Sequence, residues 1–314
     1  MPDIILALIL GYGLDLILGD PEWLYHPVRL IGRFISFMEQ KLRARGGDLR
    51  KSAVLLTVST VLVSAAAAGI IILVAGLFGR WPRLVCMALM DWMGIAVTSM
   101  AKEARGVKRA LNESVEAGRK QVSRIVGRDT QELSGEEIVK ATVETVSENT
   151  TDGVISPLIY AAIGGPILLW AFKAASTLDS MVGYLDERYR DIGWSSAKLD
   201  DVLNFVPARI TALIMCAAAF VTGLDAKNAL RIVRRDHANH LSPNCAWSEA
   251  AAAGALHIQL GGTHTYFGKT VYKPTIGDAD RPAEAEDITK ANRLLYGTSL
   301  LAVCVIAIIG RIIG

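Results

Sequence analysis

Three carboxylates recur at helical spacing just before a long apolar segment. Glu144, Glu148 and Asp152 are each four residues apart, which places them on one face of a helix. Like charges at this spacing repel each other unless a cation offsets them. A Mg²⁺ ion held by carboxylates and substrate phosphates would supply that cation, so these residues are the predicted metal ligands. A solvated acidic helix face is the alternative interpretation.

A second charged group follows the same apolar segment. Lys198, Asp200 and Asp201 lie close together, and Arg209 follows. The acidic pair is similar to those that hold Mg²⁺-diphosphate in membrane prenyl transferases, although no second DDxxD-like partner accompanies it. Lys173 and Lys198 are either phosphate ligands or cations that reach the lipid headgroups from membrane helices.

Two polar segments are candidate binding loops. Arg119 and Arg128, in GRKQVSRIVGRDT, indicate an anion cradle, and a basic amphipathic helix on lipid headgroups is the alternative. His237 and His240 have HxxH spacing, but two further zinc ligands are not evident. A loop for a ligand rich in amides is the preferred interpretation. Its residues are Asn239, His240, Ser242 and Asn244.

Membrane helices must position these groups. The 314 residues are 52% hydrophobic, yet 20% are charged, and the mean hydropathy is +0.35. This combination excludes an ordinary soluble enzyme and a transporter lying almost wholly in lipid. It predicts an all-α polytopic integral membrane protein with about five to six apolar helices and large helical cytoplasmic loops. The four cysteines lack metal spacing, and no nucleic-acid partner is expected.

The apolar segments set the expected helices. Residues 52–79 are uncharged and exceed the roughly 20 residues that cross a bilayer. The segment 154–172 is expected to be broken or re-entrant at Gly164–Pro166, and Asp91 should face protein. Ser134 and Glu137 indicate a capping box that opens the helix carrying Glu144. The remaining apolar segments are 4–18, 84–100, 203–223 and 294–310.

Charge counts predict the orientation. Loops 20–51, 101–153 and 224–293 contain seven, nine and nine Lys or Arg residues, which favours the cytoplasm. Loop 173–202 joins them if the broken segment is re-entrant and lies outside if it spans the membrane. We expect one membrane-embedded catalytic domain, 1–314, in the cytoplasmic membrane, with these four loops on its active-site face. The polar region 227–293 shows little strand character.

Several blocks together resemble the adenosylcobinamide-phosphate synthase (cobinamide synthase) family of cobalamin biosynthesis. The similarity runs in order from about residue 11 to 297. It implies a membrane ligase that joins adenosylcobyric acid to aminopropanol phosphate, or aminopropanol, with ATP and Mg²⁺. The blocks are GDPEWLYHPVRLIG (19–32), GRKQVSRIVGRDT (118–130), ATVETVSENTTDGVISPLIYAAIGG (141–165), KAASTLDSMVGY (173–184), RYRDIGWSSAKLDDVLNFVPAR (188–209) and NHLSPNCAWSEAAAAGAL (239–256).

The chemistry that this resemblance implies gives each candidate residue a hypothetical role. Asp179, Asp200 or Asp201 would receive the amine or its proton, and Glu144, Glu148 and Asp152 would hold the metal. Phosphate and substrate binding would involve Arg119, Arg128, Lys173, Lys198 and Arg209. The amide-rimmed corrin would contact His26, Asn239, His240, Ser242 and Asn244.

Three other classes compete with this interpretation. A membrane sensor or regulatory relative would lose the polar motifs, which are all retained here. A membrane alcohol phosphotransferase would carry a DGxxAR…GxxxD…D signature, which is absent. A transporter is disfavoured by the long charged loops and missing repeat symmetry. The expected partners are the corrinoid, the amino alcohol, the bilayer and other cobalamin-assembly enzymes.

Overall fold

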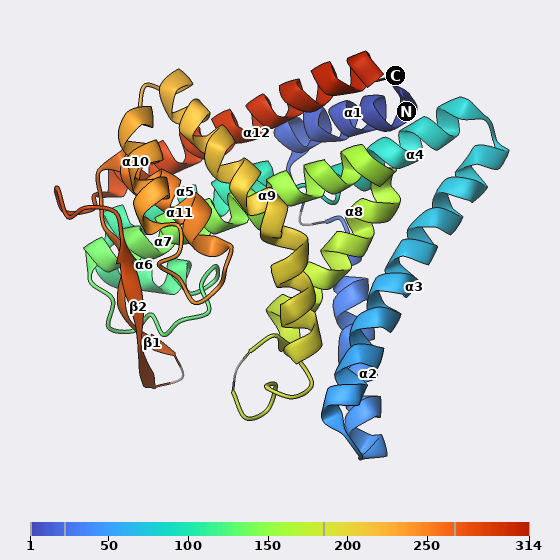
Figure 1. Cartoon of the computed structure of the whole chain (residues 1–314), viewed down its shortest axis with the longest axis horizontal. Helices are drawn as coiled ribbons and strands as arrows, with labels where there is room; N and C mark the ends of the chain where they lie inside the picture. Colours follow the sequence, from blue (N-terminus) through green and yellow to red (C-terminus); the bar gives the residue numbers. More distant parts are fainter. Residues whose placement is uncertain (1, 22, 185, 267, 314) are drawn as a thin grey trace. The chain divides into compact units, whose positions relative to one another are not determined.

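The computed structural model describes residues 2–21, 23–184, 186–266 and 268–313. Apart from one short hairpin, the regular structure of these residues is helical, which confirms the all-α prediction (Figure 1). Five helical segments among them are long and apolar enough to cross a membrane, as expected from the hydropathy. These segments are Leu49–Leu77, Arg80–Glu113, Gly135–Val182, Trp194–Val221 and Ala285–Ile312.

The chain forms two compact units, each assembled from separate stretches of sequence. The first unit contains Met1–Ala96, Ser156–Asn204 and Val303–Gly314. The second contains Val97–Ile155 and Phe205–Ala302. The single catalytic domain over 1–314 stays a prediction, and each unit is described by itself.

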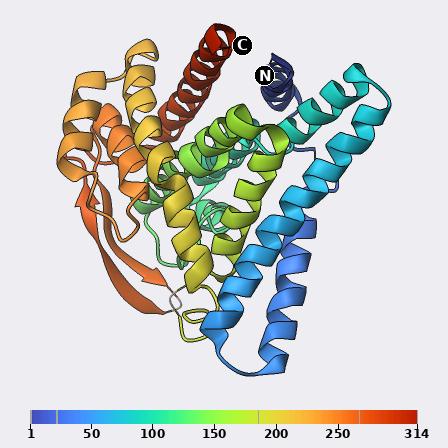
Figure 2. The same cartoon turned by 45° about the vertical axis from the view of Figure 1, so that its right-hand side comes forward.

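The first unit is a helical bundle. α1 (Pro2–Leu18) packs against α4 (Arg80–Trp92), and α2 (Pro27–Arg45) lies beside α3 (Leu49–Leu77) in both Figures 1 and 2. Asp48 caps α3 by accepting hydrogen bonds from the Arg50 and Lys51 amides. The apolar span begins directly after this polar cap. Gly11 permits the close α1–α4 approach, because an added Cβ would lie 2.8 Å from the Ala88 carbonyl oxygen. Asp91 is buried, as expected.

The predicted break in the apolar segment is present within α8 (Ser156–Val182). Gly164 and Gly165 have non-helical backbone angles, and Gly165 has a φ of 63°, which favours glycine. Pro166 follows and cannot supply an amide hydrogen to the preceding turn. Figure 1 shows α8 changing direction along its length, and the re-entrant topology stays a prediction.

In the second unit α7 (Gly135–Asn149) packs against helices on several sides, among them α5 (Val97–Glu113), α6 (Val115–Val122) and α11 (Cys245–Leu256). The predicted capping box is confirmed: the Ser134 side chain accepts from the Glu137 amide, and the Glu137 side chain accepts from the Ser134 amide. The unit also includes α10 (Ala226–Asp236) and the first part of α12 (Ala285–Ile313). α9 (Trp194–Val221) contributes its residues from Phe205 onward.

Two features of this unit differ from the sequence expectations. A π-helix, η1 (Thr150–Ile155), continues α7, so Asp152 does not follow the α-helical register that the four-residue spacing assumed. An antiparallel hairpin, β1 (Leu260–Tyr266) and β2 (Lys269–Ile276), lies in the region expected to show little strand character. The pairing register shifts between Leu260 and Gly262, where Gly261 of β1 lies opposite the two β2 residues Pro274 and Thr275.

Candidate functional site

The principal polar group lies in the second unit and centres on a buried ion pair. Arg128, between α6 and α7, contacts the Glu144 carboxylate of α7. The Gly261 amide of β1 donates to the other Glu144 oxygen (2.8 Å). Arg128 also donates to the Nδ1 atom of His264 (2.6 Å), which requires a neutral imidazole. Burial and then the Arg128 charge lower the pKa of His264 to about 4, in agreement with a neutral ring.

The hairpin supplies this backbone donor from Gly261, at the point where the strand pairing shifts register. The residue has a φ of 76°, and an added Cβ would lie 2.4 Å from the Pro274 carbonyl oxygen. Two features therefore require glycine at this position: the positive backbone angle and the close approach of β2. At this register shift the Gly261 amide donates to Glu144.

One turn further along α7, Glu148 accepts a hydrogen bond from the Cys245 thiol (3.1 Å). Burial, followed by the charges of Glu148 and Glu249, raises the pKa of Cys245 well above its ordinary value. The thiol therefore stays protonated and acts as a hydrogen-bond donor. It does not act as a nucleophile, because the thiolate is the nucleophilic form of cysteine. The Asp152 charge contributes to the same shift, which places Asp152 in this neighbourhood.

Glu249 of α11 is the most deeply buried carboxyl of the group. Burial and the charges of Glu144 and Glu148 raise its pKa well above the ordinary value, against the opposing charges of Lys273 and Arg128. With Glu249 neutral, the charged side chains of this group are the cations Arg128 and Lys273 and the anions Glu144, Glu148 and Asp152. One negative charge is therefore in excess, which a bound cation would offset.

The loop before α11 folds back on itself through its own side chains. The Ser242 amide donates to Nδ1 of His240 (3.0 Å), and the Asn244 amide donates to the Ser242 hydroxyl oxygen (3.2 Å). Burial, followed by the Lys273 charge, lowers the pKa of His240, so its ring is neutral and Nε2 carries the hydrogen. Asn239 donates to the Thr275 carbonyl oxygen of β2 (3.1 Å), which ties the loop to the hairpin.

Arg209 of α9 also contacts this loop. Its guanidinium donates to the Asn244 side-chain oxygen (3.3 Å) and lies 4.8 Å from the Trp247 ring centroid. The same guanidinium lies 3.5 Å from the Phe205 ring centroid. Stacking on two rings fixes the orientation of the cation beside the loop.

The first unit contains a separate pocket that includes two predicted site residues. His26 and Lys173 line a cavity of about 370 Å³, together with Asp20 and Arg29. The His26 Nδ1 atom accepts from the Val28 amide (3.2 Å), which caps α2. Burial lowers the pKa of His26, and the nearby Asp20 charge opposes this effect.

The remaining predicted catalytic carboxylates also lie in the first unit. Asp200 accepts from the Asn204 amide nitrogen (3.0 Å), and Asn204 accepts from the Ser156 hydroxyl (2.6 Å). Lys198 forms an exposed ion pair with Asp201 (3.3 Å). Asp179 lies near the end of α8, one turn before Gly183. A Cβ added at Gly183 would lie 2.0 Å from the Asp179 Oδ1 atom. The roles assigned to these carboxylates stay predictions.

The structure thus divides the predicted residues into groups. Arg119 of α6 lies apart from both groups that follow, because it pairs with Glu116 of the same helix and donates to the Leu133 carbonyl oxygen (2.8 Å). The second unit gathers Arg128, Glu144, Glu148, Asp152, Arg209, Asn239, His240, Ser242 and Asn244. The first unit contains His26, Lys173, Asp179, Lys198, Asp200 and Asp201.

Sequence reasoning did not assign roles to five residues of the principal group. These are Cys245, Glu249, Gly261, His264 and Lys273. Glu249 is the one residue of this set with a visible signal, because an acid within an alanine-rich helix is unlike its neighbours. The other four are recognised only once the hairpin and α11 pack against α7.

The predicted metal ligands fit a cation only in part. Both Glu144 oxygens already accept hydrogen bonds, from Arg128 and the Gly261 amide. Among the described residues, no group of three His, Cys, Asp or Glu side chains is arranged to hold a metal ion. Glu148 and Asp152 are therefore the carboxylates that would share an ion with substrate phosphates, as Mg²⁺ commonly requires.

The chain is similar to known proteins of cobalamin biosynthesis over most of its length. A family model described as "CobD/Cbib protein" matches residues 8–295. The "Cobalamin biosynthesis protein CobD" of Listeria monocytogenes serotype 4b (strain F2365) is 45% identical over 94% of each chain. That of Geobacter metallireducens is 46% identical over 96% of this chain and 95% of its own. The "Cobalamin biosynthesis protein CbiB" of Salmonella arizonae is 45% identical over 95% of each chain. No solved structure matches.

Proposed function

Because the chain belongs to the CobD/CbiB family of cobalamin biosynthesis proteins, we propose that it is an ATP- and Mg²⁺-dependent ligase. The reaction joins a carboxylate of adenosylcobyric acid to the amine of aminopropanol phosphate, or of aminopropanol. The product with the phosphorylated substrate is adenosylcobinamide phosphate. The enzyme acts at the cytoplasmic membrane, with its active site towards the cytoplasm.

The chemistry sets what the protein must supply. A carboxylate is a poor electrophile, so it first attacks the γ-phosphorus of ATP, forming an acyl phosphate and releasing ADP. The amine, after losing its proton, attacks the acyl carbon, and the carbon–oxygen bond breaks with release of inorganic phosphate. Catalysis of phosphoryl transfer depends mainly on positioning and on neutralising charge.

The buried polar group around Glu144 is the observation that carries this proposal. Arg128 and Lys273 place two cations beside Glu144, Glu148 and Glu249 in a setting where water is largely excluded. Electrostatic interactions are stronger in such a setting than in water. Arg128 and Lys273 are the cations proposed to neutralise the charge of the phosphoryl group.

The loop 239–244 suits the amide-rimmed corrinoid. His240 has its Nε2 hydrogen available because Nδ1 accepts from Ser242, so the ring is proposed to donate to a substrate carbonyl. The Arg209 guanidinium, oriented by two aromatic rings, is proposed to contact the substrate at the same loop. Asn239 and Asn244 hold the loop in shape through their side chains.

Mg²⁺, when bound, would neutralise the phosphates of ATP, and Glu148 and Asp152 would hold it. The proton acceptor for the amine is proposed among Asp179, Asp200 and Asp201. Other cobalamin-assembly enzymes are proposed partners of this protein at the membrane.

A reconstituted assay tests this function. The full chain in lipid nanodiscs receives adenosylcobyric acid, aminopropanol phosphate and Mg-ATP, and the corrinoid product is identified by mass. We expect product, with one ADP for each amide formed, and no product when ATP, Mg²⁺ or the amine is left out. A folded protein that yields no amide with either amino alcohol would overturn the proposal.

A further inference from the structure

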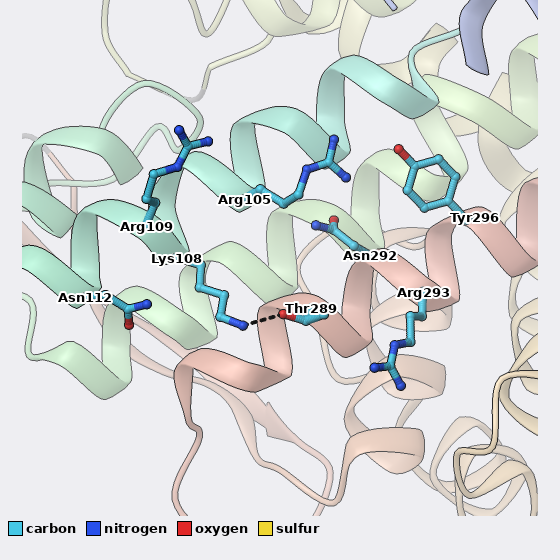
Figure 3. Close-up of a pocket in the computed structure, with 8 residues that line it drawn as sticks. All are labelled: Arg105, Lys108, Arg109, Asn112, Thr289, Asn292, Arg293 and Tyr296. Carbon is cyan, nitrogen blue, oxygen red and sulfur yellow. Dashed lines mark hydrogen bonds between the residues drawn. The ribbon is translucent and has the colours of Figure 1, made fainter. Parts of the chain in front are cut away.

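A basic pocket in the second unit lies apart from the residues discussed above. It occupies about 460 Å³ between α5 and α12, and Figure 3 shows its lining. Four of its side chains are cations, and the others are two amides, a threonine and a tyrosine. The lining residues are Arg105, Lys108, Arg109, Asn112, Thr289, Asn292, Arg293 and Tyr296.

One carboxylate, Glu286, offsets part of the positive charge of this pocket, and its charge also acts on Arg293. Lys108 is neutralised by Glu286 (2.5 Å) and donates to Thr289 (2.7 Å). Within the described residues, Arg105, Arg109 and Arg293 have neither a hydrogen bond nor a salt bridge, and all three are exposed. Three guanidiniums on facing helices repel each other unless an anion lies between them. Guanidinium groups bind phosphate through paired hydrogen bonds.

A second observation is the buried amide of Asn292. The residue is 5% exposed, and its Nδ2 atom donates to the Ala101 carbonyl oxygen (3.2 Å), which fixes the orientation of the amide. The Oδ1 atom is buried and accepts no hydrogen bond from the described residues. In Figure 3 this amide lies among the four cations. A buried acceptor without a donor is costly, so the site favours a ligand that brings its own donor.

The place of the pocket along α12 indicates where such a ligand comes from. Residues 294–310, directly after Arg293, contain no Asp, Glu, Lys or Arg. The pocket is therefore at the level where the apolar span meets the headgroup region. Both a phospholipid headgroup and a soluble phosphate ester can reach this level.

We propose that this pocket binds a phosphoryl anion that carries a neighbouring hydroxyl or amino donor. The phosphate contacts Arg105, Arg109 and Arg293, and the donor group contacts the Oδ1 atom of Asn292. The proposal does not depend on the ligase function, because none of the pocket residues belongs to the Glu144 group.

Two binding experiments on the full chain distinguish the sources of the phosphate. In the first, AMP binding is measured by equilibrium dialysis in phosphatidylcholine nanodiscs. In the second, phosphatidylglycerol retained by the purified protein is counted by native mass spectrometry. Wild type is compared with the triple variant Arg105→Gln/Arg109→Gln/Arg293→Gln. The matched control, Lys120→Gln/Lys227→Gln/Arg234→Gln, removes the same charge from exposed positions of the same unit.

We expect the triple variant to bind at least one probe about tenfold more weakly than wild type, whereas the control binds as wild type does. Loss of AMP binding supports a soluble phosphate ester, and loss of phosphatidylglycerol supports a lipid headgroup. Equal binding of both probes by wild type and triple variant would overturn the proposal. The single variants Arg105→Gln and Arg109→Gln, each with an exposed and unbonded side chain, repeat the test if the triple variant does not fold.

Discussion

Arg128 and Glu144 form an ion pair in which 6% and 8% of the two side chains remain exposed. The second Glu144 oxygen is satisfied by the Gly261 amide, and the second side of the guanidinium contacts His264. The pair therefore joins the loop after α6, the helix α7 and the hairpin. Its burial distinguishes it from the exposed ion pairs of the same unit, such as Arg124 with Glu103 (3.4 Å).

Removing one partner of this pair should be more harmful than removing both. Arg128→Met leaves a buried carboxylate without its cation, which costs about 3–5 kcal/mol of stability in typical proteins. Glu144→Gln leaves the opposite charge, and the double variant leaves neither. We expect both single variants to lower the unfolding temperature in detergent more than the double variant does. Arg124→Met is the control and should cost about 1 kcal/mol or less. A loss from Arg128→Met no larger than that of this control would contradict the buried pair.

The burial of Glu249 predicts a specific pH dependence. Its pKa is raised in the folded protein, so the unfolded chain releases this proton near pH 4.5 while the folded chain retains it. Stability from this group is therefore complete below pH 4.5 and is lost as the pH rises towards the folded pKa. Glu249→Gln replaces the carboxyl with an amide that does not ionise, so the variant should become progressively more stable relative to wild type as the pH rises above 4.5.

The exposed Glu132 provides the control for this measurement. Glu132→Gln should show an unfolding temperature that differs from wild type by the same small amount at each pH. If the difference between Glu249→Gln and wild type is equally independent of pH, Glu249 is not held neutral.

The α1–α4 contact can be tested with two glycines of one helix. An added Cβ at Gly11 would lie 2.8 Å from the Ala88 carbonyl oxygen, whereas at Gly13 it meets nothing within 4 Å. We expect Gly11→Ala to destabilise the protein by about 1–3 kcal/mol through overpacking. Gly13→Ala should be neutral or stabilising by up to about 1 kcal/mol, since alanine favours helix more than glycine does. Thermal unfolding in detergent measures both, and equal effects would argue against this close approach.

Local signals in the sequence predicted much of the helical framework. The apolar length of 52–79, the capping box at Ser134 and the glycine pair before Pro166 each act through near neighbours in the chain. The burial of Asp91 also followed from its place in an apolar helix. Such features depend on composition and spacing, so they can be inferred before the tertiary fold is known.

The hairpin was missed because its strand pairing depends on contacts between residues that are distant in the chain. The π-helix was missed because it changes the helical register. The β1–β2 pairing requires Gly261 to approach Pro274, which is thirteen residues away. The π-helix at 150–155 changes the register on which the Asp152 prediction relied. The spacing of Glu144 predicted a metal ligand, and only the fold shows that Arg128 and the Gly261 amide occupy its two oxygens.

Glu148 offers the most direct test of the proposed ligase site, because its carboxylate contacts the Cys245 thiol and carries no ion pair in the described part of the chain. Wild type and Glu148→Gln, both purified in nanodiscs with equal unfolding temperatures, are assayed for amide product with adenosylcobyric acid, aminopropanol phosphate and Mg-ATP. We predict that Glu148→Gln lowers turnover by about 100-fold or more, because an amide is a weaker ligand than a carboxylate for the proposed Mg²⁺ ion that would neutralise charge on the phosphates. Turnover by Glu148→Gln within a few-fold of wild type would contradict the assignment of this buried group as the active site.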